Sequence, residues 1–361
     1  MQGISIKKEK KSFGFIDTIR CISMIGIVFE HAAIVGDPKT SDFLPEMLHV
    51  SVMQLFKFAT IAFFLIGGFL INHKFTEYTA SQYLKNRFKS TIKPWLFWLH
   101  VLLLCNIGSL LFKYLKDGNS DRLPSSFLSY IGEQYYQVAF FSSFWFVLNF
   151  LICISILLLF KRFIYKIWFG VVLFLISLFY GFNLYQGWII TSHTTAIFGF
   201  VFYLWLGVFA NKYYEQLFAF INKTSIWMFV AITFFFFLLA DLEALYLKSL
   251  AVNDIYNTLR VSNIVYSLSF FLILLKIGSI EFINKHFEPR KTTFGIYLVH
   301  HIIIFHVLTE IFRPLKIDIN TLTLFQGVAY TILRFVITYV MSMLIVKLIA
   351  RTKLKWAIGA T

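Results

Sequence analysis

About ten apolar segments recur along the chain, each near the ~20 residues that a helix needs to cross a bilayer, and they constrain its fold more than any other feature. Of the 361 residues, 58% are hydrophobic and only 14% are charged, so lipid must surround most side chains. No sustained alternation of apolar and polar residues indicates strands. The sequence predicts an all-α polytopic membrane protein of about ten transmembrane helices, in a single domain over residues 1–361. The predicted helices are 13–35, 52–72, 92–115, 144–161, 164–181, 188–210, 227–247, 261–280, 294–312 and 321–349.

The net charge of +15 is spread over short basic clusters between the apolar segments, and it forms no single stripe of the kind that binds nucleic acid. The positive-inside rule places such clusters in the cytoplasm. We therefore predict that both termini are cytoplasmic, with a basic stretch at 1–12 and a basic tail at 350–361. The segments 37–46, 116–122 and 247–260 are then expected on the opposite side. No small-residue cleavage site follows the first apolar segment, so we expect that helix to be uncleaved.

The three cysteines, Cys21, Cys105 and Cys153, each lie within an apolar segment. This placement argues against disulfide bonds and favours a role in packing. The adjacent His300 and His301 point about 100° apart on a helix, and no paired cysteines or H-x-x-x-H pattern accompany them. We therefore expect no metal site.

The first apolar segment carries four ionisable residues, which are costly inside a membrane and are therefore candidates for function. At about 100° per residue, Arg20 and His31 return to within about 20° of one helix face and are separated by roughly 16 Å along the axis. Asp17 can pair with Arg20, whereas Glu30 points about 100° away from His31, so an acid that orients His31 must come from another helix. The plain alternative is that Arg20 reaches the cytoplasmic headgroups and His31 marks the opposite interface.

Arg20 and His31 belong to a first motif at 16–22 and 28–31. Further motifs follow it along the chain, at 63–71, 85–94, 144–147 and 293–300. Together they resemble the acyltransferase-3 family of membrane proteins, in which a basic residue, ten others and a histidine open the pattern. Two positions depart from it: Gly67 stands where a serine is usual, and Thr91 stands where a second arginine is expected three residues before Pro94. Because no hydrolase-like domain follows residue 361, we expect the stand-alone form of the family.

The resemblance implies transfer of an acyl group, usually acetyl, from cytoplasmic acyl-CoA to a hydroxyl of a glycan, a lipid-linked sugar or a small metabolite. Acyl-CoA is then a co-substrate, and no permanently bound cofactor is expected. A sugar hydroxyl is a poor nucleophile, so a neutral imidazole is a suitable general base, and His31 is the candidate. Arg20, Arg87 and Lys89 are placed to hold the donor's phosphates, although Arg87 and Lys89 also fit ordinary positive-inside charge.

Other polar and aromatic residues are candidates for substrate binding. Trp145 and Tyr297 either line a cavity or anchor helix ends at the membrane interface. His300 either orients substrate or satisfies a neighbouring backbone group. Asp241 and Glu243, near the outer end of the segment 227–247, either supply the acid that His31 needs or contact water.

Two other classes of function compete with an enzyme. A transporter or flippase for a polar lipid or oligosaccharide also lines its path with Arg, Asp and His, but the chain has no matched pair of short, broken helices. A structural or assembly subunit leaves the charges within the membrane unexplained. The sequence thus predicts an acyltransferase of the bacterial inner membrane whose partners are acyl-CoA, a glycan or lipid-linked sugar, and membrane lipid, with no nucleic acid.

Overall fold

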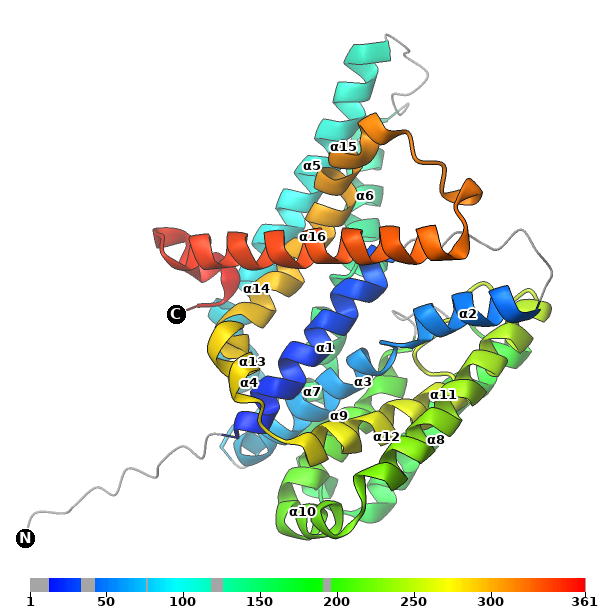
Figure 1. The fold of residues 1–361 in the computed structure, drawn as a ribbon. Helices are drawn as coiled ribbons and strands as arrows, with labels where there is room; N and C mark the ends of the chain where they lie inside the picture. Colours follow the sequence, from blue (N-terminus) through cyan, green and yellow to red (C-terminus); the bar gives the residue numbers. More distant parts are fainter. Residues whose placement is uncertain (1–12, 34–42, 76, 118–125, 191–195, 361) are drawn as a thin grey trace, which may run out of the picture.

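The computed structural model describes residues 13–33, 43–75, 77–117, 126–190 and 196–360, and it contains no strand within them (Figure 1). The all-α prediction is therefore confirmed for this part of the chain. The predicted basic stretch at 1–12 lies outside the described residues, as do parts of the segments 37–46 and 116–122. The α-helices are α1 (Gly14–Ala32), α2 (Phe43–Gln54), α3 (Phe58–Ile71), α4 (Ala80–Arg87), α5 (Lys93–Asp117), α6 (Phe127–Phe141), α7 (Trp145–Leu159), α8 (Ile167–Gln186), α9 (Ile197–Lys212), α10 (Tyr214–Lys223), α11 (Ile226–Ser249), α12 (Val261–Ile277), α13 (Glu281–His286), α14 (Pro289–Ile302), α15 (Leu308–Phe312) and α16 (Leu324–Ala350).

Six helical stretches of the described chain are long and apolar enough to cross a membrane, or up to seven if the bent pair α6 and α7 is counted as one. Three further predicted segments coincide with α1, α9 and α12. Of these, α9 and α12 are only 16 and 17 residues long, and α1 carries Asp17, Arg20 and Glu30. The chain is thus a multi-pass membrane protein, and the number of ten spans stays a prediction. The six stretches are Phe43–Ile71, Ala80–Lys116, Ile167–Gln186, Ile226–Ser249, Pro289–Leu315 and Leu324–Ala350.

The helix α6 is absent from the sequence prediction, because Glu133, Gln134 and Gln137 interrupt its apolar pattern. It meets α7 at a bend of 63°. Two side chains from other helices donate hydrogen bonds to backbone carbonyls at this bend and so help to fix it. Trp95 Nε1 donates a hydrogen bond to the Phe144 carbonyl at 3.1 Å, and the Tyr297 hydroxyl donates to the Ser143 carbonyl.

Helices α3 and α9 cross at close range because each presents a glycine to the backbone of the other. A Cβ added at Gly68 would lie 1.9 Å from the carbonyl oxygen of Leu204, and one added at Gly207 would lie 2.0 Å from that of Leu65. Small residues allow membrane helices to approach this closely. The crossing holds α3 in the core, where it also packs against α1 and α12.

A fully buried guanidinium ties α12 to α2 and α11. Arg260 donates a hydrogen bond to the Ala240 carbonyl at 2.6 Å and another to the side-chain oxygen of Gln54. Gln54 in turn donates to the Asn263 side chain at 2.7 Å. A buried cation is tolerated only when such partners replace its lost water, so this network stabilises one specific packing of the three helices.

The basic tail predicted at 350–361 folds back onto the helices. After α16, the 3₁₀ segment η8 (Lys353–Ile358) packs against α5, and Trp98 Nε1 donates a hydrogen bond to the Ala357 carbonyl at 2.8 Å. Ala357 and Ile358 are buried. These apolar residues, set among the lysines, dock the segment, and they bring Gly359 to the edge of the cavity described next.

Candidate functional site

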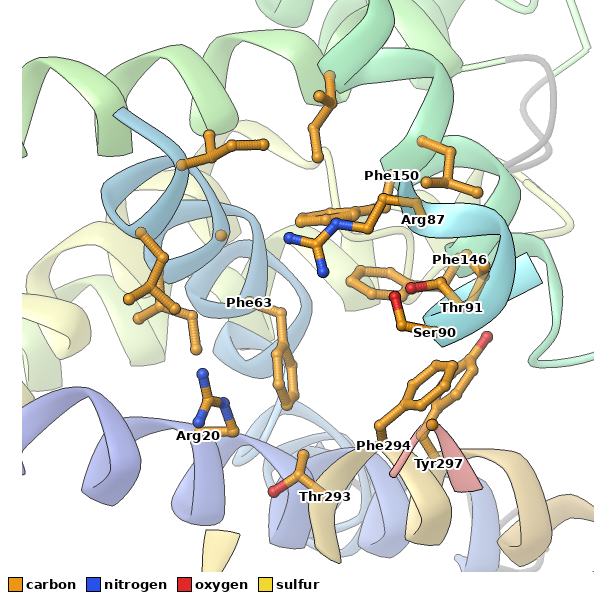
Figure 2. Close-up of a pocket in the computed structure, with 18 of the residues that line it drawn as sticks. Arg20, Phe63, Arg87, Ser90, Thr91, Phe146, Phe150, Thr293, Phe294 and Tyr297 are labelled. Atoms are coloured by element: carbon orange, nitrogen blue, oxygen red, sulfur yellow. The ribbon is translucent and has the colours of Figure 1, made fainter. Parts of the chain in front are cut away.

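A cavity of about 530 Å³ lies among α1, α3, α4, α7 and α14, and we call it the arginine cavity. Figure 2 shows Arg20 and Arg87 approaching it from opposite sides, with phenylalanine rings between and beside them. Its volume lies within the ~300–1,000 Å³ typical of small-molecule sites. Two cations beside an aromatic wall suit a ligand with an anionic group and a less polar arm. The wall is formed by Phe63, Phe146, Phe150 and Phe294, and the hydroxyls at the cavity belong to Ser90, Thr91, Thr293, Tyr83 and Tyr297.

Arg20 is held at the cavity by a carboxylate that it shares with a second arginine. Its Nη1 donates to Asp17 Oδ1 at 2.7 Å, as predicted from their spacing, and Arg290 Nη2 donates to Asp17 Oδ2 at 2.9 Å. Arg290, at the start of α14, also lines the cavity. One carboxylate thus faces two guanidiniums, which leaves a net positive charge on this side of the cavity.

Arg87 is positioned by Tyr83, one helical turn earlier on α4. Arg87 Nε donates a hydrogen bond to the Tyr83 hydroxyl at 2.9 Å, and the guanidinium carbon lies 5.1 Å from the centre of the Tyr83 ring. Tyr83 is buried, so it presents a fixed acceptor. Tyr83 is not among the residues predicted from the sequence, although its spacing of four residues from Arg87 is the one that brings helical side chains together.

The segment between α4 and α5 is a π-helical turn, η2 (Phe88–Ile92), and it changes which side chains face the cavity. Ser90 and Thr91 line the cavity from this turn. Thr91 therefore occupies the place at which the family pattern has its second arginine. Lys89 is exposed and is not among the lining residues, so the structure does not bring it to Arg20 and Arg87.

His31, near the end of α1, lies beside two histidines of α14. The ring centres of His31 and His300 are 5.4 Å apart, and those of His31 and His301 are 6.5 Å apart. The ring of Tyr297, which lines the arginine cavity, lies 5.9 Å from that of His300. The structure therefore connects the predicted residues Tyr297, His300 and His31 in one row that leads away from the arginine cavity.

The backbone dictates the tautomer of His300. Its Nδ1 lies 2.7 Å from the Tyr297 carbonyl oxygen and 3.2 Å from that of Ile296. A carbonyl only accepts hydrogen bonds, so Nδ1 carries the proton and neutral His300 has its lone pair on Nε2. Nε2 is buried and has no hydrogen-bond partner in the part of the chain that the structure describes. His300 is thus an acceptor directed away from its own helix, beside His31.

Glu30, which lies on the same turn of α1, and the two predicted acids Asp241 and Glu243 each accept a hydrogen bond from a side chain or backbone group other than His31. Glu30 accepts a hydrogen bond from Lys57 at 2.5 Å, as an ion pair between α1 and the start of α3. Asp241 accepts from the Ser51 hydroxyl at 2.6 Å, and Glu243 accepts from the backbone of α12 at Ser262 (3.0 Å). That Asp241 or Glu243 supplies the acid for His31 therefore stays a prediction, whereas the rings of His300 and His301 lie beside His31.

Trp145 lies behind the aromatic wall and is not a lining residue. Its ring centre is 5.5 Å from that of Phe200 and 5.9 Å from that of Phe146, which does line the cavity. It can therefore support the wall but does not reach the space within it. Among the described residues, no group of three or more His, Cys, Asp or Glu side chains is placed to hold a metal ion.

A family model described as an acyltransferase domain matches residues 13–346, nearly the whole chain. Searches of curated proteins and of solved structures found no match. The matched range includes both sides of the arginine cavity and all three histidines near the end of α1.

Proposed function

Because the chain belongs to the acyltransferase-3 family of membrane acyltransferases, we propose that it transfers an acetyl group from cytoplasmic acyl-CoA to a hydroxyl of a cell-envelope glycan or lipid-linked sugar. Arg20 and Arg87 bind the donor, and His31 is the general base. One observation carries this proposal: a single cavity holds both arginines and is joined through Tyr297 and His300 to His31. The transporter alternative gains no support from the family match.

The arginine cavity suits both parts of acyl-CoA. Guanidinium groups form short, charge-assisted hydrogen bonds with phosphate oxygens, and two of them on opposite walls hold an anionic group between them. The phenylalanine wall suits the less polar pantetheine arm. Arg20 and His31 are eleven residues apart on α1, or roughly 16 Å along its axis, so a long arm is needed to bring the thioester to His31.

The transfer needs a base that takes the proton of the acceptor hydroxyl and then gives it to the departing sulfur. The acceptor hydroxyl gives its proton to the unprotonated ring nitrogen of His31 while its oxygen attacks the thioester carbonyl. The carbon–sulfur bond breaks, an ester bond forms, and the proton on His31 passes to the departing sulfur, so that CoA leaves as a thiol. His300, with Nε2 as an acceptor, is placed to orient an N–H of His31 during this exchange.

The proposed topology gives this arrangement its direction. With about ten spans and both termini cytoplasmic, the start of α1 with Arg20 lies near the cytoplasm, where acyl-CoA is found, and His31 lies toward the opposite side. The location that we propose is the bacterial inner membrane. A donor from one side and an acceptor from the other then meet near His31.

The experiment uses purified protein in lipid nanodiscs with radiolabelled acetyl-CoA and an envelope glycolipid extract. We expect CoA release and a labelled product with wild type, and a rate about 100- to 10,000-fold lower with His31→Ala. His31→Gln keeps a hydrogen-bonding group but supplies no base at neutral pH, so it should not restore transfer.

The matched control is His100→Ala, since His100 is an exposed histidine of α5 outside the arginine cavity. Its activity should equal wild type. Full transfer by a His31→Ala protein that is present in the membrane at the wild-type level would make His31 an interface anchor or structural partner. Absence of acetyl-CoA consumption by wild type, with succinyl-CoA also unused, would remove the donor assignment.

A further inference from the structure

A second cavity, of about 870 Å³, lies among α5, α6 and the α14–α15 stretch, and the proposed donor site does not use it. In Figure 1, α5, α6 and α15 lie together at the top, and α14 leads up to α15 from the centre of the view. Its lining combines amide, hydroxyl and imidazole groups with apolar surfaces. The uncharged polar groups include Asn106, Ser109, Gln137, Ser142, His301, His306 and Thr309, and the apolar ones include Leu102, Phe112, Phe141 and Phe305. Three charged side chains also line the cavity, Lys113 and the ion-paired Glu310 and Arg313.

The polar lining is held in fixed directions by a short hydrogen-bond chain. His306 Nε2 lies 3.0 Å from Asn106 Oδ1, and the Asn106 amide group donates to Gln134 Oε1 at 3.0 Å. Since Asn106 Oδ1 accepts, His306 Nε2 carries the proton. His306 Nδ1 is then the acceptor for the Ser109 hydroxyl at 3.3 Å. Such a prearranged set of donors and acceptors is typical of a site that recognises hydroxyl groups.

The second cavity lies beside His301, which neighbours His31 at the end of the row Tyr297, His300 and His31. His301 lines it, and the ring of His301 is 6.5 Å from that of His31. His301 Nδ1 is buried and lacks a hydrogen-bond partner within the described residues, so a ligand hydroxyl can pair with it. His31 therefore lies between the arginine cavity on the Tyr297 side and the second cavity on the His301 side.

The bend between α6 and α7 separates the two cavities. Ser142 lines the second cavity, while the carbonyl of the next residue, Ser143, accepts the hydroxyl of Tyr297, which lines the arginine cavity. A π-helical turn also contributes polar residues to each cavity. Ser90 and Thr91 of η2 line the arginine cavity, and His306 of η5 (Ile303–Val307) lines the second cavity. Such turns are frequent at functional sites because they redirect side chains.

We propose that the second cavity binds the acceptor as a hydroxyl-rich sugar on an apolar anchor, and that it presents one sugar hydroxyl to His31 past His301. This inference rests on the proposed acyl transfer. The amide, hydroxyl and imidazole groups can each donate to or accept from sugar hydroxyls, and the phenylalanines suit the apolar face of a sugar and its anchor. A cavity of about 870 Å³ has room for a sugar with part of its anchor.

The chain contains a natural reporter for occupancy of this cavity. Of its three cysteines, Cys21 and Cys153 are 1% and 0% exposed, whereas Cys105 is half-buried and lines the second cavity. A small charged methanethiosulfonate reagent should therefore label wild type at Cys105 and leave Cys105→Ser unlabelled.

The test measures the labelling rate of Cys105 in nanodiscs without acyl-CoA, with octyl β-D-glucoside as the probe. At ten times its Kd, the glucoside should slow labelling about tenfold, because only the unoccupied fraction reacts. Octyl tetraethylene glycol has the same alkyl chain without the sugar and should not protect. Asn106→Leu, and the milder Ser109→Ala, should weaken protection by the glucoside.

Equal protection by both octyl compounds would show a general amphiphile site and overturn the sugar assignment, as would absence of protection by either. Because the binding assay contains no donor, protection by the glucoside stands even where the acyl-transfer proposal fails. Conversely, acetyl transfer to octyl glucoside without protection of Cys105 would leave the proposed function intact and place the acceptor elsewhere.

Discussion

The contact between Tyr83 and Arg87 allows a direct test of how the proposed donor site is held. Tyr83→Phe removes the hydroxyl that accepts from Arg87 Nε at 2.9 Å but keeps the ring beside the guanidinium. A hydrogen bond to a charged group contributes about 1.5–3 kcal/mol, and the lower value is appropriate because Arg87 is only half-buried. About 1.5 kcal/mol corresponds to roughly a tenfold rise in the KM for acetyl-CoA. The kcat should not change if Arg87 acts only in binding the donor, as we propose.

The assay measures CoA release over a range of acetyl-CoA concentrations for Tyr83→Phe, Arg87→Ala and the double variant. If Tyr83 acts only by positioning Arg87, the double variant should have the KM of Arg87→Ala alone to within about 0.5 kcal/mol. Tyr136→Phe, on an exposed tyrosine of α6, is the matched control. Independent, additive effects of the two substitutions, or an unchanged KM in Tyr83→Phe alone, would refute the positioning role.

Three further variants test the proposed donor site, the helix crossing and the proposed topology. Arg20→Ala should raise the KM for acetyl-CoA more than Arg87→Ala does, and it should still fold, because Asp17 keeps its contact with Arg290. Gly68→Ala should destabilise the protein by about 1–3 kcal/mol or more, seen as a lower Tm by nanoscale fluorimetry, whereas Gly108→Ala, which faces open space, should not. A reporter inserted at the exposed Asn253 should lie outside the cytoplasm; a cytoplasmic result would contradict the proposed topology.

The parts of the fold that depend on neighbouring residues could be predicted from the sequence. The helical period placed Asp17 beside Arg20, and the structure has them 2.7 Å apart. The apolar segments also predicted where most of the long helices lie, because a helix that crosses lipid is apolar along most of its length. The same period argues against grouping Lys89 with Arg87, since residues two apart on a helix do not face each other.

The partners of His31 could not be predicted in this way, because they depend on which helices meet. Hydropathy does not distinguish a packing of α1 on α14 from one on α11, so it could not place the ring of His300 beside that of His31. The π-helical turn that brings Thr91 to the arginine cavity is likewise a product of tertiary packing. The docked segment around Ala357 is short and lies among lysines, so no periodic pattern predicts it.

The close approach of Gly67 and Phe150 implies a constraint on how this cavity can vary in evolution. A Cβ at position 67 would lie 2.5 Å from the Phe150 ring, so the serine that is usual there in the family cannot coexist with this ring position. A chain that acquires serine at 67 must therefore shrink or turn the residue at 150, and the reverse exchange opens room for a ring. The two positions are expected to change together among descendants of a common ancestor. In each such pair, the space at this side of the arginine cavity is filled either by a side chain of α3 or by a ring of α7.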